Sequence, residues 1–278
     1  MSIRDFFRPV ELIDADEVRR LIKEKRLGEY NLVDVRQPHE YEEGHLPGSV
    51  LIPLSELPRR AGELDPARPT VAYCRSGKRS LSAAAILDGA GFSVKSMDGG
   101  IGAYHGLVAT GGPEAGMAFF APGTTTPELT ALAWLLEDGT EKFYHAACQH
   151  ICKEREHKEL ISMLESAEDA HKKRLLETCS TLMGREPLPD FPKGIMELPA
   201  EDIMEGGVKV SEALEWARGR KMREVLELMM ALEANALDLY IRMSRRVEDD
   251  GARRVFETLA EEEKAHLEKL SGALSGLA

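Results

Sequence analysis

The first 110 residues alternate short apolar runs with segments of helical periodicity. The apolar runs are rich in β-branched residues and are short enough to be strands. The expected strands are residues 30–35, 50–53, 71–74 and 93–97, and the expected helices are residues 16–24 and 79–89. Because strands that alternate with helices form parallel sheets, residues 1–110 are predicted to be a small α/β domain with a mostly parallel sheet.

The pattern changes after residue 110. Residues 111–126 are rich in Gly, Ala, Thr and Pro, which is typical of a linker. The Thr-Pro-Glu sequence at 126–128 then predicts a helix start, because Thr can cap the free amides and Pro suits the first helical position. Residues 127–278 show helical periodicity, interrupted by a Pro- and Gly-rich segment at 184–207. This pattern predicts two helical hairpins joined by a long crossover, which is an all-α four-helix bundle.

A spaced pattern of glutamate, tyrosine and histidine occurs twice in the helical region. The first copy is Glu137, Tyr144, Glu168 and His171, and the second copy is Glu233, Tyr240, Glu263 and His266. The first glutamate precedes the ExxH pair by 31 residues in one copy and by 30 in the other. Residues three positions apart share a helix face. Turns are expected near residues 152 and 248, midway between the single glutamate and the ExxH pair of each hairpin. The glutamate and the pair should therefore lie side by side, at the same position along the two helix axes.

Two further ExxH pairs show that this motif alone is weak evidence for a metal site. Glu42 and His45 lie in the first domain, and Glu154 and His157 lie too near the expected turn to reach Glu137. Each of these pairs is expected to be an ordinary polar pair. The ordered repeat of all the elements is what favours a metal site.

The repeat supplies four carboxylates and two imidazoles, a hard ligand set that suits iron or manganese better than zinc. The predicted metal ligands are Glu137, Glu168, His171, Glu233, Glu263 and His266. The region 125–278 resembles the rubrerythrin branch of the ferritin-like superfamily. This resemblance implies a centre of two iron ions, with manganese or a mixed pair as the alternative, and the reduction of peroxide or oxygen. It also implies that Tyr144 and Tyr240 lie beside the ligands, while an ordinary core role is the alternative for each.

The helical region departs from typical rubrerythrins in two ways. It lacks the rubredoxin module, whose CxxC pairs hold an iron that relays electrons, so an external electron donor such as a rubredoxin-like protein is expected. Its second ExxH pair makes the site more symmetric, as in bacterioferritin, whereas an extra glutamate is common in rubrerythrins. Iron binding, storage or sensing with little turnover is therefore the alternative function. Bundles of this type often associate, so a homodimer is expected.

A loop that contains a cysteine follows one of the predicted strands of the first domain. Its residues are Cys74, Arg75, Ser76, Gly77, Lys78 and Arg79. Backbone amides at the start of the following helix and three cationic side chains should lower the pKa of the Cys74 thiol and bind an anion. A buried structural cysteine is the alternative.

The cysteine loop resembles the active-site loop of rhodaneses. Residues 32–36, 44–49 and 97–100 match other stretches of that family in the expected order. The resemblance implies a sulfurtransferase in which Cys74 attacks a small-molecule sulfane-sulfur donor, carries the sulfur as a persulfide and passes it to a thiol acceptor. Use of the module for docking a partner or for sensing persulfide is the alternative.

The resemblance also implies roles for the charged residues around the cysteine. The amides of residues 75–80 would hold the anion, with added positive charge from Arg75, Lys78 and Arg79, whereas Asp34 and Arg36 would brace the loop. A tyrosine-phosphatase-like loop is the competing interpretation, since it also joins a cysteine and an arginine in an anion cradle. Such loops place five residues between the two, but only four separate Cys74 from Arg79.

Composition limits the remaining classes. The formal net charge is -12 and no long basic run is present, so nucleic acid is not an expected partner. No apolar stretch has the length of a membrane span, so no membrane is expected either. Residues 1–10 lack the basic-then-apolar layout of a signal peptide, and a cytoplasmic location is expected.

The other three cysteines, Cys148, Cys152 and Cys179, form no CxxC pair and are expected to be free thiols. An additional metal or redox site of Cys148 and Cys152 with His150 and His157 is the alternative. The whole sequence is thus interpreted as a fusion of an α/β rhodanese-like sulfurtransferase domain (1–110) with an all-α rubrerythrin-like di-iron domain (127–278). The expected function joins sulfur transfer to di-iron redox chemistry.

Overall fold

The computed structural model describes residues 10–25, 28–111, 124–186, 190–197 and 199–277. The chain divides into two compact units, Met1–Pro113 and Glu114–Ala278. Most of the predicted linker and a part of the predicted crossover lie outside the described residues. Among the helices of the described residues, none combines the length and the apolar character that crossing a membrane requires.

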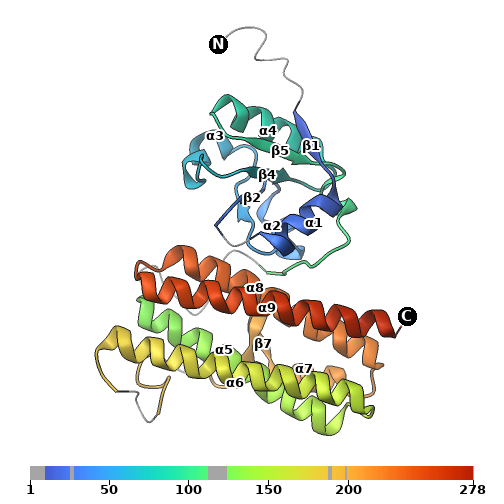
Figure 1. The fold of residues 1–278 in the computed structure, drawn as a ribbon, viewed down its shortest axis with the longest axis vertical. Coiled ribbons are helices and arrows are strands. Elements are labelled where there is room, and N and C mark those ends of the chain that lie inside the picture. Colours follow the sequence, from blue (N-terminus) through green and yellow to red (C-terminus); the bar gives the residue numbers. More distant parts are fainter. Residues whose placement is uncertain (1–9, 26–27, 112–123, 187–189, 198, 278) are drawn as a thin grey trace. The chain divides into compact units, whose positions relative to one another are not determined.

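Five parallel strands form the sheet of the first unit (Figure 1). They are β1 (Glu11–Ile13), β2 (Asn31–Asp34), β3 (Val50–Leu51), β4 (Thr70–Tyr73) and β5 (Val94–Met97). Their order is β1-β5-β4-β2-β3, and every residue of the inner strands β2 and β4 is buried. The predicted parallel α/β domain is confirmed. The apolar pattern does not predict β1, because only Ile13 of its three residues is buried.

Helices cover both faces of this sheet. They are α1 (Ala15–Glu24), α2 (Pro38–Glu43), α3 (Leu57–Arg60) and α4 (Lys78–Gly89), with 3-10 turns η2 (Ala61–Glu63) and η3 (Gly100–Ala103). Successive strand residues point to opposite faces. Leu32 accordingly packs in one core cluster with Val18 of α1, and Val33 packs in another with Ala83 of α4. Cys74 lies between the end of β4 and the start of α4, as the sequence predicts.

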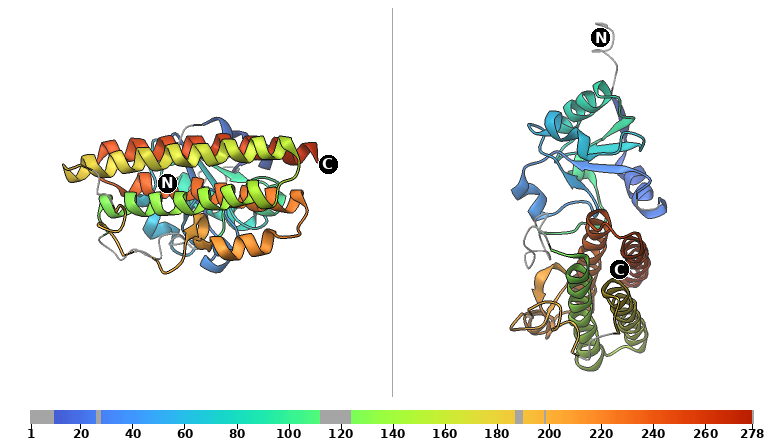
Figure 2. Two further views of the ribbon diagram at one scale, coloured as in Figure 1. Left: turned by 90° about the horizontal axis from the view of Figure 1, so that it is seen from below. Right: turned by 90° about the vertical axis from the view of Figure 1, so that its left-hand side faces the viewer.

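Four long helices make up most of the second unit. They are α5 (Thr126–His150), α6 (Arg155–Met183), α8 (Met222–Arg246) and α9 (Asp250–Gly276). Figure 2 shows them side by side, and α5 packs along α6, α8 along α9, and α6 against α9. The two predicted hairpins are therefore present. Their turns fall at residues 151–154 and 247–249, where they are expected.

The start of α5 differs from the prediction by one residue. Thr125, and not Thr126, is the cap: its hydroxyl accepts from the amide of Glu128, and the Glu128 carboxylate accepts from the amide of Thr125. This reciprocal pair satisfies two amides that the helix leaves free. The run of three threonines offers several equivalent caps, and the spacing to Glu128 selects Thr125.

The crossover between the hairpins is longer than predicted. It contains the short strands β6 (Ile203–Met204) and β7 (Val208–Lys209), the turn η4 (Glu205–Gly207) and an extra helix, α7 (Val210–Ala217). The predicted crossover ends at residue 207. The spacing of apolar residues in α7 is the same as in the first turns of a long helix, so the sequence does not separate α7 from α8. Gly219, with φ of 75°, separates α7 from α8.

Candidate metal cluster and cysteine loop

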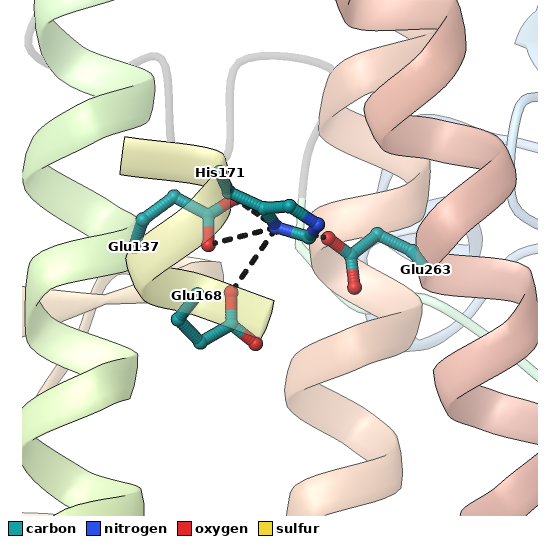
Figure 3. A group of neighbouring side chains, drawn as sticks. All are labelled: Glu137, Glu168, His171 and Glu263. Atoms are coloured by element: carbon teal, nitrogen blue, oxygen red, sulfur yellow. Dashed lines mark hydrogen bonds and ion pairs between the residues drawn. The ribbon is translucent and has the colours of Figure 1, made fainter. Parts of the chain in front are cut away.

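The six predicted ligands come together from the four long helices. Glu137 lies on α5, Glu168 and His171 on α6, Glu233 on α8, and Glu263 and His266 on α9. Each is buried, with no more than 4% of its surface exposed. Ligand atoms lie within 4.8 Å of one another in two groups, which are Glu137, Glu168, His171 and Glu263 (Figure 3), and Glu168, Glu233, Glu263 and His266. The two groups share Glu168 and Glu263.

Both histidines turn the same ring nitrogen toward the carboxylates. His171 Nδ1 lies 3.3 Å from an oxygen of Glu137, and His266 Nδ1 lies 3.1 Å from Glu233. On the opposite edge of its ring, His171 Nε2 lies 3.0 Å from Glu262, which Arg174 also contacts at 2.7 Å. A carboxylate on the outer nitrogen fixes a histidine ring, so that its inner nitrogen faces the cluster.

Two tyrosines connect the hairpins at the cluster. Tyr144 on α5 donates a hydrogen bond to Glu233 on α8, and Tyr240 on α8 donates one to Glu137 on α5. Both hydroxyls are buried with the rings, and burial raises the pKa of each phenol well above its ordinary value. The predicted position of both tyrosines beside the ligands is therefore correct, and each bond crosses from one hairpin to the other.

Burial and neighbouring charges raise the pKa of some carboxyl groups in the cluster and lower the pKa of others. Burial raises the pKa of Glu168 and of Glu263 well above the usual range, and the neighbouring carboxylates of Glu137 and Glu233 raise them further. Burial also opposes ionisation of Glu137, but the charge of His171 overcomes it and lowers the pKa of Glu137. Although burial disfavours the imidazolium, Glu137 raises the pKa of His171 to about 11. The cluster therefore shares protons when it holds no cation.

Three buried oxygens in this cluster lack a hydrogen-bond partner among the described residues. They are Thr140 Oγ1, Glu205 Oε2 and Glu263 Oε1, the last of which lies 3.3 Å from His171 Nδ1 as an ion-pair contact. All three residues line one small pocket with Glu168 and Glu233. Carboxylate oxygens that are buried without a partner cost free energy unless a cation or a proton neutralises them. The donor set is all oxygen and nitrogen, which suits iron or manganese. The residues present thus fit a pair of such ions.

Stability without metal is expected to fall as pH rises. Glu168, Glu263 and His171 have pKa values raised by folding, so their contribution is complete below their unfolded values, 4.5 for the glutamates and 6.5 for the histidine. It is lost progressively as pH rises from those values to the raised pKa of each group. The lowered pKa of Glu137 acts oppositely, below pH 4.5. Thermal unfolding of the chelator-treated chain should show its highest midpoint for the helical unit at mildly acidic pH.

The same measurement with added manganese should reverse the trend, because metal binding requires deprotonated ligands. Glu168→Gln is the matched variant, since it removes one group whose pKa is raised and keeps its shape. It should flatten the decline between pH 5 and 8. A metal-free midpoint that rises over this range would contradict the proposed sharing of protons.

Local hydrogen bonds define the environment of Cys74 in the first unit. Burial of the thiol opposes its ionisation, but the backbone amides of Ser80, Ser76 and Arg79 together hold the pKa of Cys74 below its usual value. The Ser80 hydroxyl lies 3.7 Å from Cys74 Sγ and accepts a hydrogen bond from Ser96. This ring of donors favours a thiolate, as the sequence predicts.

Residues 100–102, which follow β5, hold the cysteine loop in place. The amide of Ile101 donates to the carbonyl oxygen of Cys74 at 2.8 Å, and that of Gly102 donates to Arg75 at 3.0 Å. At Gly100, with φ of 62°, a Cβ would lie 2.3 Å from the Cys74 carbonyl oxygen. Only glycine therefore fits at this position.

Gly100→Ala is expected to destabilise the first unit by about 3 kcal/mol, because it combines the left-handed backbone with a backbone clash. It should also slow any reaction at Cys74. Gly91→Ala is the matched control: Gly91 has φ of 93°, but a Cβ there would meet nothing within 4 Å. The control should cost about 1 kcal/mol. Equal unfolding midpoints for the two variants in urea would show that the contact with Cys74 does not matter.

The charged residues of the loop are not equivalent. Arg79 makes two hydrogen bonds to the Glu40 carboxylate, of 2.6 and 2.7 Å, and holds the pKa of Glu40 at about 2. Arg79, one of the three predicted cationic side chains, is thus paired with a carboxylate, because α2 brings Glu40 beside the start of α4. Arg75 and Lys78 are exposed, and Arg75 lines a pocket of about 240 Å³ next to the loop.

Asp34 and Arg36 form a buried ion pair that supports the neighbouring strand end. Arg36 donates to Asp34 at 2.6 Å and to the carbonyl oxygen of Gly44 at 2.7 Å. Its guanidinium also lies over the ring of Tyr73, the residue before Cys74. The pair thus braces the strand that leads into the loop and has no direct contact with the thiol among the interactions of the described residues.

The family model of the Rhodanese-like domain matches residues 14–107. Over 96 residues the chain is 35% identical to YtwF of Bacillus subtilis, which is 34% of this chain and 82% of YtwF. The chain belongs to the rhodanese-like family. It is also 42% identical to a sulfurtransferase of Allochromatium vinosum over 79 residues, which is 27% of this chain and 74% of that protein.

The rhodanese-like relatives differ in how much of their length is matched. The chain is 41% identical over 90 residues to the HTH-type transcriptional regulator Rv0324 of Mycobacterium tuberculosis, which is 32% of this chain and only 40% of Rv0324. Rhodanese-like domains thus occur within proteins of different overall composition. The family match concerns residues 14–107, and the resemblance of residues 127–278 to rubrerythrins stays a prediction.

The remaining cysteines stand apart from the rhodanese-like loop. Burial raises the pKa of Cys152 to about 11 and also raises that of Cys179, so both favour the neutral thiol. Helix α5 ends at His150, so Cys148 and Cys152 do not share a helix face. Within the described part of the chain, the only groups of side chains spaced for a metal are the two that contain the six predicted ligands. The alternative of an additional metal site is therefore not supported.

Proposed function

We propose that the chain is a redox protein that combines sulfur transfer at Cys74 with a di-iron centre held by α5, α6, α8 and α9. The first half of this proposal rests on the family membership and on the donors around the Cys74 thiol. The second half rests on one observation: six buried side chains of ligand type, from four helices, turn their donor atoms toward one another.

Sulfur transfer would proceed in two displacements at Cys74. The thiolate attacks the outer sulfur of a sulfane donor such as thiosulfate, a new S–S bond forms, and the donor's own S–S bond breaks, so that sulfite leaves with the electron pair. A thiol acceptor in its thiolate form then attacks the outer sulfur of the persulfide, and Cys74 leaves as a thiolate. The amides that lower the pKa of Cys74 favour both its attack and its departure.

The sulfur step is tested by incubating the protein with thiosulfate and measuring its intact mass. An increase by one sulfur atom, located on the peptide that contains Cys74 and removed by a thiol acceptor, is the expected result. A protein that gains no sulfur from thiosulfate or from a small persulfide would argue for a docking or sensing module. The Allochromatium relative is named a sulfurtransferase, and this name supports an enzymatic role for Cys74.

The helical unit would then be a ferritin-like four-helix bundle. Four carboxylates balance the charge of two ferrous ions, and without cations these buried groups are costly. The six side chains of the two groups would hold the ions, and Glu168 and Glu263 belong to both groups. Bound iron would supply one electron per ion for the reduction of peroxide or oxygen. The tyrosines orient Glu137 and Glu233, and Glu262 orients His171.

Stopped-flow oxidation of the ferrous-loaded protein by peroxide tests this half. Repeated turnover with an added electron donor, such as a rubredoxin-like protein, is the expected result. A single oxidation without re-reduction would instead support iron binding, storage or sensing. That second candidate is favoured by one sequence feature: the four cysteines form no CxxC pair that could relay electrons.

A further inference from the structure

A fifth buried acidic side chain lies at the candidate metal cluster and comes from outside the helical repeat. Glu205 belongs to the turn η4 of the crossover, between β6 and β7. Only 2% of its surface is exposed, and it lines the same pocket as Glu168, Glu233 and Glu263. Its Oε2 has no hydrogen-bond partner among the described residues. A buried carboxylate oxygen without a partner is rare in folded proteins and requires an explanation.

The chain is built to place Glu205 at this point. Beside Gly139 of α5 the crossover backbone approaches so closely that a Cβ on Gly139 would lie 2.0 Å from the carbonyl oxygen of Ile203. On the other side, a Cβ on Gly206 would lie 2.5 Å from Nδ2 of Asn235 on α8. The crossover is therefore packed against both α5 and α8, at the height of Glu137 and Glu233.

An ion pair holds the same segment from outside. Lys142 Nζ lies 2.9 Å from both Asp138 on its own helix and Asp202 on the crossover. Asp202 precedes the strand β6, whose Ile203 contacts Gly139, so the ion pair and the close approach fix the same short stretch of backbone. Glu205 thus points into the pocket because its backbone is anchored, and not because a partner in the protein binds its carboxylate.

We propose that Glu205 is a further metal ligand, a fifth carboxylate that the crossover delivers to the two-ion centre. The inference rests on the proposed di-iron function. The oxygens of Glu205 lie outside both groups of ligand atoms within 4.8 Å, so Glu205 reaches an ion by rotation of its own side chain. A fifth carboxylate adds one oxygen donor and one negative charge, so it strengthens the binding of a cation at this centre.

Cobalt(II) titration of the metal-free full-length chain tests this ligand, because the visible absorption of cobalt reports its coordination number directly. Wild type should take up two ions. Glu205→Gln should bind one of the ions about 10- to 100-fold more weakly and should change the cobalt spectrum. Glu201→Gln is the matched control, since Glu201 lies on the same crossover with an exposed side chain paired to Lys209. The control should match wild type in affinity and in spectrum.

Two further measurements separate the outcomes. The metal-free Glu205→Gln protein should unfold at or above the wild-type temperature, because a buried carboxylate has been removed, so a binding defect is not a folding defect. Gly139→Ala should displace Ile203 and reproduce the spectral change with Glu205 intact. If Glu205→Gln keeps the wild-type spectrum and both affinities, Glu205 is not a ligand, although the proposed function stands. If wild type binds no cobalt and no iron, the proposed function fails, and the inference fails with it.

Discussion

Iron binding is expected to be lost when Glu168 and His171 are both replaced with alanine. Wild type reconstituted with ferrous iron should contain two ions per chain, and Glu168→Ala/His171→Ala should contain fewer than one. Glu168 belongs to both groups of ligand atoms, so its loss weakens both ions. His171 provides one of only two imidazoles in the cluster. Metal content after desalting, measured by plasma mass spectrometry, is the readout.

Helix α6 contains its own control for this experiment. Glu154 and His157 form another ExxH pair near the start of the same helix, where Glu154 is the capping residue and the two side chains pair with each other at 3.4 Å. Glu154→Ala/His157→Ala therefore changes the same residue types at the same spacing without touching the cluster. It should retain two ions per chain. Equal metal contents in the two variants would show that the inner ExxH pair is not a ligand pair.

Cys74→Ser is expected to lower the rate of sulfur transfer from thiosulfate to a thiol by at least about 10³-fold. A serine hydroxyl ionises far above neutral pH and cannot carry sulfane sulfur as a persulfide. Iron content should be unchanged, because the ligands lie in the other compact unit. The readouts are sulfite release and the mass of the protein after incubation with the donor.

Cys148→Ser is the matched control for this variant, since Cys148 is a half-buried free thiol of the helical unit. It should transfer sulfur at the wild-type rate. If Cys74→Ser retains activity within tenfold of wild type while Cys148→Ser loses it, the reactive thiol has been misassigned. If both variants are active, the transfer does not proceed through either cysteine.

The sequence predicts the helical cluster well because the cluster follows from local geometry. Spacing of three places Glu168 and His171 on one face, and the intervals of 31 and 30 residues bring two helices of a hairpin back to equal height. Both effects depend only on helical rise and turn position. The parallel sheet is predicted for a similar reason, since its inner strands are short continuous apolar runs.

What the sequence does not predict depends on contacts between distant segments. Glu205 lies outside the repeat, and the signal that could have drawn attention to it is a glutamate directly before Gly206 and Gly207 in a crossover. Its burial follows from the close approach of Ile203 to Gly139, sixty-four positions earlier in the chain. The ion pair of Arg79 with Glu40 likewise joins two helices that no local pattern relates. Such pairings are set by how whole elements pack, and one sequence does not report them.

The reciprocal tyrosine hydrogen bonds bear on the history of the chain. Each hairpin supplies the phenol that holds the glutamate of the other, so neither hairpin contains a complete half of the site. Two identical hairpins related by a twofold axis would exchange their tyrosines in the same way. The internal repeat is therefore what duplication and fusion of a gene for one self-associating hairpin would leave. In such an ancestor, the metal pocket would have been the dimer interface itself.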